Sequence, residues 1–148
     1  MPNDYIHIVL ADDDYDDRLF FTDAFDELNM NTKVSTFNDG VELMNYLNSE
    51  NAMLPQVLFL DLNMPKKNGI ECLNEIKANS NMNDIAIAIY STSASEEDIE
   101  ETFVLGANIY IKKPSSFKDL KKILAEVVSI NWQYHTSGLN KDNFLLRL

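Results

Sequence analysis

Three aspartates of the sequence have the type and the spacing to form a metal site. Asp12 and Asp13 directly follow the apolar run 6–11, and Asp61 directly follows the apolar run 57–60. Three carboxylates at close range repel one another, at about 4 kcal/mol for each pair 4 Å apart with an effective dielectric constant near 20. A divalent cation relieves this repulsion, and Mg²⁺ in particular takes one or two carboxylates while leaving positions for water and phosphate oxygens.

Two further residues suit a phosphoryl group beside that metal. Ser91 and Lys113 each follow a later apolar run, and they offer a hydroxyl donor and a compact cation. One carboxylate would then act as the nucleophile, while the metal, the hydroxyl and the ammonium stabilise the phosphoryl group in transfer.

The elements that carry these residues are predicted from apolar periodicity. Short apolar runs typical of buried strands alternate with segments whose apolar residues have helical spacing. In the first such helical segment, the residues expected to face the core are Leu19, Phe20, Ala24, Phe25 and Leu28. Side-chain caps that precede an acid by three residues mark four of the helix starts, at Asp39, Asn68, Ser95 and Ser116, and Gly106 suits a helix end.

Strands that alternate with helices predict an α/β fold with a doubly wound, five-stranded parallel sheet, for which 2-1-3-4-5 is a common strand order. In such a sheet, ligands bind beyond the carboxyl ends of the strands, where the strand order reverses. That point lies between strands 1 and 3, so Asp12, Asp13 and Asp61 are expected to share one crevice.

Length, charge and composition exclude several classes of protein. The chain has 148 residues, which is one domain with little left over. Its 12 basic and 24 acidic residues give a net charge of −12, which argues against binding of a nucleic-acid backbone. The sequence has one cysteine, no signal segment and no apolar run near the roughly 20 residues of a membrane span. These features predict a cytoplasmic protein that does not bind membranes.

Over Tyr5–Ile130, the sequence resembles the receiver domain of two-component response regulators, which has a flavodoxin-like fold. The matching motifs are Asp12-Asp13, the run Leu60–Pro65, Gly69 eight residues beyond Asp61, Ser91, and the run Tyr110–Pro114. Each motif alone is weak, whereas their order and spacing together are specific.

The resemblance implies that Asp61 is the phosphoacceptor. Mg²⁺ would be held by Asp12, Asp13 and Asp61 together with the backbone carbonyl of Asn63. The phosphoryl donor would be a histidine kinase or a histidine phosphotransfer protein, and the chain would be a signalling module that assists its own phosphotransfer, not an enzyme.

The resemblance also implies a switch. Lys113 would contact the phosphoryl oxygens, with a cis peptide bond between Lys113 and Pro114. Ser91 would move toward the phosphoryl group, and Tyr110 would change rotamer behind it. The altered surface of helix 4, strand 5 and helix 5 would then bind a downstream protein target, because no effector domain follows in this sequence.

Other residues near the site receive smaller roles. Asp14 and Asn63 lie where members of the family tune the lifetime of the acyl phosphate, and Thr92 is expected to narrow the approach to Asp61. The remaining acids of the first helix, Asp16 and Asp17, are interpreted with Asp14 as a solvated helix start that favours the helix dipole.

Residues 131–148 extend beyond the receiver-like domain 5–130. They are too apolar for a solvated tail and are expected to dock on their own domain or on a second subunit. The apolar residues are Trp132, Tyr134, Phe144, Leu145, Leu146 and Leu148. Such tails resemble those of stand-alone regulators that partner phytochrome-type histidine kinases, among which homodimers are common.

Two other functions remain open. A haloacid-dehalogenase-like phosphatase also uses an aspartyl phosphate and Mg²⁺, but it needs a second aspartate two residues after the nucleophile, where this chain has Asn63. A receiver-like interaction domain that is never phosphorylated is the third possibility, and the complete set of site residues disfavours it.

Overall fold

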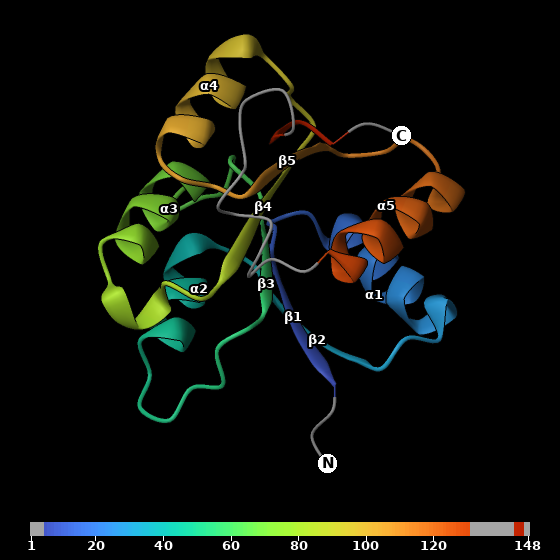
Figure 1. Cartoon of the computed structure of the whole chain (residues 1–148), viewed down its shortest axis with the longest axis horizontal. Coiled ribbons are helices and arrows are strands. Elements are labelled where there is room, and N and C mark those ends of the chain that lie inside the picture. The colour runs from blue at the N-terminus through green and yellow to red at the C-terminus, as the bar shows by residue number, and fades with distance from the viewer. Residues whose placement is uncertain (1–4, 131–143, 147–148) are drawn as a thin grey trace.

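The computed structural model describes residues 5–130 and 144–146. In these residues, five strands form one parallel sheet in the order β2-β1-β3-β4-β5, as predicted (Figure 1). The strands are β1 (Ile6–Ala11), β2 (Thr32–Phe37), β3 (Val57–Leu60), β4 (Ala86–Ser91) and β5 (Ile109–Lys112). The helices are α1 (Tyr15–Leu28), α2 (Gly40–Leu47), α3 (Gly69–Lys77), α4 (Glu96–Val104) and α5 (Phe117–Ser129), with a short 3₁₀ helix, η1 (Ser80–Met82), before β4.

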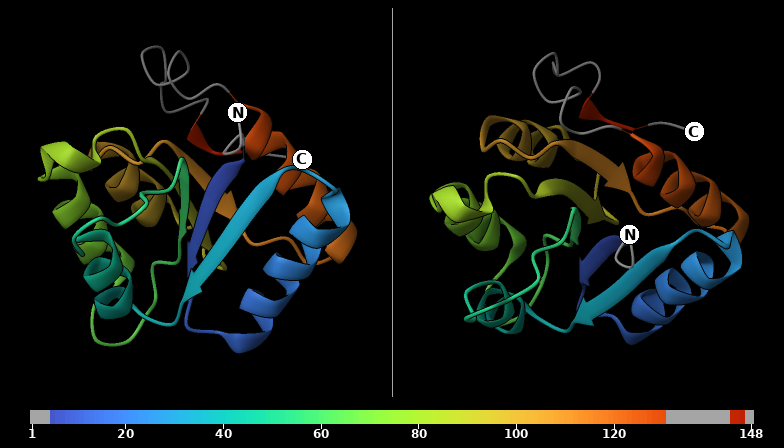
Figure 2. Two further views of the ribbon diagram at one scale, coloured as in Figure 1. Left: turned by 90° about the horizontal axis from the view of Figure 1, so that it is seen from below. Right: turned by 60° about the horizontal axis from the view of Figure 1, so that its bottom comes forward.

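Helices cover both faces of the sheet. Figures 1 and 2 show α1 and α5 on one face and α2, α3 and α4 on the other. Because successive side chains of a strand point to opposite faces, β1 serves both layers. Ile8 and Leu10 join the core cluster under α1 and α5, whereas Val9 and Ala11 join the cluster under the other three helices. This double burial explains the nearly continuous apolar runs of the strands.

The buried face of α1 differs from the predicted one. Phe21, Ala24 and Phe25 are buried, but 45% of Leu19 and 52% of Phe20 is exposed. The prediction was wrong for Leu19 and Phe20 because residues 19–21 are all apolar, so helical spacing alone did not identify which of them faces the sheet.

The predicted helix starts are confirmed. The side chains of Asp39, Asn68, Ser95 and Ser116 each accept a hydrogen bond from the backbone N–H three residues later. Gly106, which follows Leu105, the C-cap of α4, has a φ of 96°, a left-handed conformation that favours glycine.

The segment at residues 144–146 packs on its own domain. Phe144 is fully buried, with its ring centroid 5.3 Å from that of Phe103 and 6.1 Å from that of Tyr110. Leu145 forms an isolated parallel bridge with Tyr110, and the N–H of Leu146 donates to the Tyr110 carbonyl at 2.9 Å. The segment therefore lies along β5, the edge strand of the sheet. Trp132, Tyr134 and Leu148 lie outside the described residues.

Across the part of the chain that the structure describes, no helix has both the length and the apolar character needed to cross a lipid bilayer. The longest helix among the described residues, α1, has 14 residues.

Gly69, the first residue of α3, allows the chain to pass close to Asp61. A Cβ atom at this position would lie 2.3 Å from the Asp61 carbonyl oxygen and 2.8 Å from the Leu62 Cα. The Gly69 N–H also donates to the Leu62 carbonyl at 3.0 Å. The spacing of eight residues between Asp61 and this glycine therefore reflects a backbone contact that no larger residue can make.

We expect Gly69→Ala to lower the free energy of unfolding by about 1–3 kcal/mol, because the added methyl group must displace the backbone of Asp61. Urea denaturation measures this change. Val104→Ala, at an exposed position of α4, is the control and should stay within about 0.5 kcal/mol of wild type. Equal stability of Gly69→Ala and wild type would contradict the close contact.

Candidate functional site

The pairing of β1 with β3 brings the three predicted carboxylates together. Ala11 is the partner of Leu60 in the sheet, and the Asp61 N–H donates to the Ala11 carbonyl at 3.0 Å. One carboxylate oxygen from each of Asp12, Asp13 and Asp61 lies within 4.8 Å of the others. Asp12 is fully buried, Asp61 is nearly so, and Asp13 is exposed.

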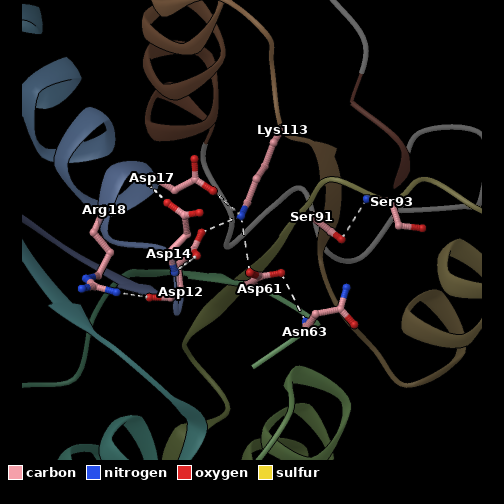
Figure 3. A network of polar contacts seen from close by, with 9 residues as sticks. All are labelled: Asp12, Asp14, Asp17, Arg18, Asp61, Asn63, Ser91, Ser93 and Lys113. Carbon is pink, nitrogen blue, oxygen red and sulfur yellow. Dashed lines mark hydrogen bonds and ion pairs between the residues drawn. The ribbon is translucent and has the colours of Figure 1, made fainter. Parts of the chain in front are cut away.

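Lys113 places its ammonium group among these carboxylates. Its backbone N–H donates to the Ser91 carbonyl at 2.7 Å, which fixes the residue at the end of β5. The Lys113 Nζ lies 2.7 Å from Asp12 Oδ2, 2.8 Å from Asp17 Oδ2 and 3.4 Å from Asp61 Oδ2 (Figure 3). Only 9% of the Lys113 side chain is exposed, so this cation has little water to solvate it and depends on the three carboxylates.

Backbone groups orient the two buried carboxylates. Asp12 Oδ1 accepts a hydrogen bond from the Asp14 N–H at 2.9 Å, and Asp61 Oδ1 accepts one from the Asn63 N–H at 3.3 Å. Arg18 holds the same turn, because its Nη1 donates to the Asp12 carbonyl at 2.8 Å. Each carboxylate therefore keeps its other oxygen directed toward Lys113 and the crevice.

Burial changes the proton affinities of these groups. Desolvation raises the pKa of Asp12 to about 6, and it raises the pKa of Asp61 in the same direction. Lys113 lowers the pKa of both carboxyl groups in part, but it is shared among three partners. Burial alone would lower the pKa of Lys113, whereas its contacts with Asp12 and Asp17 raise that pKa overall. Lys113 is therefore charged at neutral pH.

The donor set fits a divalent cation. Asp12 Oδ2 is buried, and its close partner is the Lys113 ammonium, 2.7 Å away. Because Lys113 is shared among three carboxylates, it only partly offsets their negative charge, which favours a metal ion at the same oxygen atoms. Asp12, Asp13 and Asp61 supply only oxygen ligands, which suit hard cations, and the exposed side of Asp13 leaves room for water.

Ser91 and Tyr110 meet at Ser93, in the loop between β4 and α4. Ser91 Oγ, which is fully buried, accepts a hydrogen bond from the Ser93 N–H at 3.2 Å. The Tyr110 hydroxyl donates to the Ser93 carbonyl at 2.6 Å. Both predicted switch residues thus hold one loop residue, and the buried Tyr110 ring is in contact with Phe144. Thr92, which stands between Ser91 and Ser93 in the chain, is exposed.

Two expectations about the site are corrected. The described residues contain no cis peptide bond, so the expected cis bond between Lys113 and Pro114 is wrong. The trans preference before proline is only about 0.5–1 kcal/mol, so the Lys-Pro pair itself does not determine the isomer. Asp17 is not a solvated helix residue, because it forms an ion pair with Lys113. The feature of the sequence that could have indicated this ion pair is the position of Asp17 on the first helical turn after Asp12.

Comparison with known proteins identifies the family. Residues 8–125 match the response regulator receiver domain. The chain therefore belongs to the response regulator receiver family, whose members are signalling domains that bind a divalent metal at an acidic pocket.

Several relatives are similar over most of their length. The chain is 31% identical to the response regulator Rcp1 of Synechocystis over 82% of this chain and 86% of that protein. It is 30% identical to the probable methanogenesis regulatory protein FilR2 of Methanothrix harundinacea, over 81% and 79%. Among solved structures, the phosphorylated cyanobacterial phytochrome response regulator RcpA is 35% identical, with a TM-score of 0.77 over 83% of this chain and 91% of that chain. A Mn²⁺-bound form of Rcp1 is 27% identical, with a TM-score of 0.76 over 91% and 97%.

We expect excess MgCl₂ to stabilise the protein at pH 7.5 by about 2–3 kcal/mol when the metal reaches a hundred times its dissociation constant. The gain should be much smaller at pH 5. The folded-state pKa of Asp12 lies above its usual value, so Asp12 is mostly protonated at pH 5 and loses its proton as the pH rises through about 6. Without metal, the protonated Asp12 carboxyl group stabilises the fold most at pH values below its usual pKa. That contribution to stability is lost as the pH rises through about 6.

Thermal unfolding with and without MgCl₂ at the two pH values measures this difference. Asp13→Asn removes a predicted ligand and should abolish most of the gain. Asp16→Asn removes the same charge at an exposed position of α1 and should retain the gain. A stabilisation that is equal at pH 5 and pH 7.5 would show that the metal does not bind at Asp12.

Proposed function

We propose that this receiver accepts a phosphoryl group on Asp61 from a phosphohistidine of a histidine kinase or a histidine phosphotransfer protein. The observation that carries the proposal is the position of the Asp61 carboxylate. It lies at the carboxyl edge of the sheet beside two further carboxylates, and its Oδ2 is 3.4 Å from the Lys113 ammonium. Membership of the receiver family and similarity to the phosphorylated RcpA support the same reaction.

In the proposed transfer, a carboxylate oxygen of Asp61 attacks the phosphorus atom, and the bond between phosphorus and the histidine nitrogen breaks. The electron pair of that bond stays on the imidazole. Asp12, Asp13 and Asp61, with the Asn63 carbonyl, would hold Mg²⁺, which supplies charge neutralisation at the phosphoryl oxygens. Lys113 would donate a hydrogen bond to a phosphoryl oxygen, and the Ser91 hydroxyl would approach another.

The face formed by α1 and the start of α5 is proposed to receive the phosphodonor. Tyr15, Leu19 and Phe20 are apolar yet exposed by 67%, 45% and 52%. Of these three residues, Phe20 lines a cleft of about 310 Å³, together with Lys113 and Phe117 among others. Exposed apolar side chains beside a cleft are typical of a protein interface. The similarity to cyanobacterial phytochrome response regulators suggests a phytochrome-type kinase as the donor.

The proposed output passes through Ser91 and Tyr110. Movement of Ser91 toward the phosphoryl group would break its contact with the Ser93 N–H and thus release the loop that Tyr110 also holds. The surface of α4, β5 and α5 would then bind a downstream protein. A homodimer, and a cytoplasmic location, remain predictions of this proposal.

Asp14, Asn63 and Thr92 are proposed to tune the lifetime of the acyl phosphate. All three are exposed at the rim of the crevice, and Asp14 and Asn63 donate backbone hydrogen bonds to the site carboxylates. Thr92 carries a branched side chain next to Ser91, which would limit the entry of phosphodonor or water.

We expect Thr92→Ala to speed phosphorylation or dephosphorylation by about threefold, a change of less than 1 kcal/mol in the barrier. The rates are measured with a small acyl-phosphate donor and by loss of the phosphoryl group after the donor is removed. Thr92→Val keeps the branched shape and should behave as wild type. If Thr92→Ala leaves both rates unchanged, Thr92 does not restrict the site.

The reaction itself is tested by incubating the protein with MgCl₂ and a small acyl-phosphate donor, followed by intact mass measurement. We expect wild type to gain one phosphoryl group and Asp61→Asn to gain none. Turnover of varied phosphate esters would instead support the haloacid-dehalogenase-like phosphatase. Absence of any phosphoryl group in wild type would support the interaction domain that is not regulated by phosphorylation.

A further inference from the structure

Asp17 is a third carboxylate partner of Lys113. Its Oδ2 lies 2.8 Å from the Lys113 Nζ, and the contact joins the first turn of α1 to the end of β5 (Figure 3). The Asp17 N–H donates to Asp14 Oδ1, the helix cap, at 2.9 Å, so the backbone that carries Asp17 is fixed. The Asp17 side chain is 32% exposed, at the edge of a cluster whose other carboxylates, Asp12 and Asp61, are buried.

The Lys113 ammonium lies closer to Asp17 than to Asp61. Its Nζ is 2.7 Å from Asp12 and 2.8 Å from Asp17, but 3.4 Å from Asp61. A divalent cation bound by Asp12 and Asp61 would offset the negative charge of both groups. Asp17 is not in the group of carboxylates that could share this cation, so its negative charge would still attract the Lys113 ammonium. A phosphoryl group on Asp61 would therefore compete with Asp17 for one ammonium group.

We propose that Asp17 is a positioning residue for Lys113, which it holds back from the phosphoryl group on Asp61. This inference rests on the proposed function. To donate a hydrogen bond to a phosphoryl oxygen, Lys113 must break its hydrogen bond with Asp17 or divide its N–H donors between the two acceptors. Asp17 thereby lowers the stability of the phosphorylated state, and it keeps the ammonium from displacing the metal when no phosphoryl group is present.

Beryllofluoride, which binds carboxylates as a mimic of a phosphoryl group, provides the probe. Its affinity is measured by calorimetry on the full chain in saturating MgCl₂, and the affinity for Mg²⁺ alone is measured in parallel. We expect Asp17→Asn to bind beryllofluoride about three- to tenfold more tightly than wild type and to bind Mg²⁺ more weakly, because residues in direct contact couple by about 0.5–3 kcal/mol.

Two variants serve as controls at the same helix turn. Asp16→Asn removes one charge from the exposed neighbour and should change either affinity by less than about twofold, as expected for a screened surface charge. Asp17→Glu restores the carboxylate and should return the beryllofluoride affinity toward that of wild type. Equal effects of Asp17→Asn and Asp16→Asn would overturn the inference and leave the proposed function intact.

A double-mutant cycle with Lys113→Met tests whether Asp17 acts through Lys113. In the Lys113→Met background, the effect of Asp17→Asn on Mg²⁺ affinity should fall to that of Asp16→Asn. A full effect without Lys113 would mean that Asp17 acts by its charge alone, which overturns the positioning role. The comparison of Asp17→Asn with Asp16→Asn stands even if Lys113→Met does not fold. Failure of wild type to bind beryllofluoride would overturn the proposed function, and this inference with it.

Discussion

The site depends on one buried ammonium group that is shared by three carboxylates. Lys113 lies within 3.4 Å of Asp12, Asp17 and Asp61, and only 9% of its side chain is exposed. Without this cation, Asp12 and Asp61 would be buried like charges with oxygen atoms within 4.8 Å of each other. Removing one partner of a buried ion pair costs about 3–5 kcal/mol. With it, the cluster retains a net negative charge, so it still attracts a divalent cation. The charge that stabilises the resting site is also the charge proposed to contact the phosphoryl group.

The parallel sheet makes this cluster possible, because residues far apart in the chain end at one edge. Asp12 follows β1, Asp61 follows β3 and Lys113 follows β5. The pairing of Ala11 with Leu60 sets the register between β1 and β3. The hydrogen bond from the Lys113 N–H to the Ser91 carbonyl fixes the backbone of Lys113 beside the end of β4. The same edge carries the Ser93 contacts of Ser91 and Tyr110. Direct contacts thus connect Asp61 with Lys113, Ser91, Ser93, Tyr110 and Phe144.

The sequence predicts a parallel sheet and the meeting of Asp12, Asp13, Asp61 and Lys113, because both follow from the alternation of strands with helices and from the rule that parallel strands end together. The sequence pattern alone does not determine the strand order, which depends on which strands pair in the folded sheet. It does not predict which residues of a wholly apolar stretch face the core, as Leu19 and Phe20 show. It also did not identify Asp17 as a partner of Lys113, since that contact depends on the rotation of α1 about its axis. The packing of Phe144 on Tyr110 is a tertiary contact, which periodicity does not encode.

The most direct test of the account is the identity of the residue that carries the phosphoryl group. The protein is phosphorylated with a small acyl-phosphate donor in MgCl₂ and reduced with borohydride, which converts an aspartyl phosphate to homoserine. Peptide mass spectrometry then locates the modified residue. We expect homoserine at position 61, beside the Lys113 ammonium, and no conversion in the Asp61→Asn variant. Homoserine at Asp12 or Asp13 instead of Asp61 would contradict this expectation.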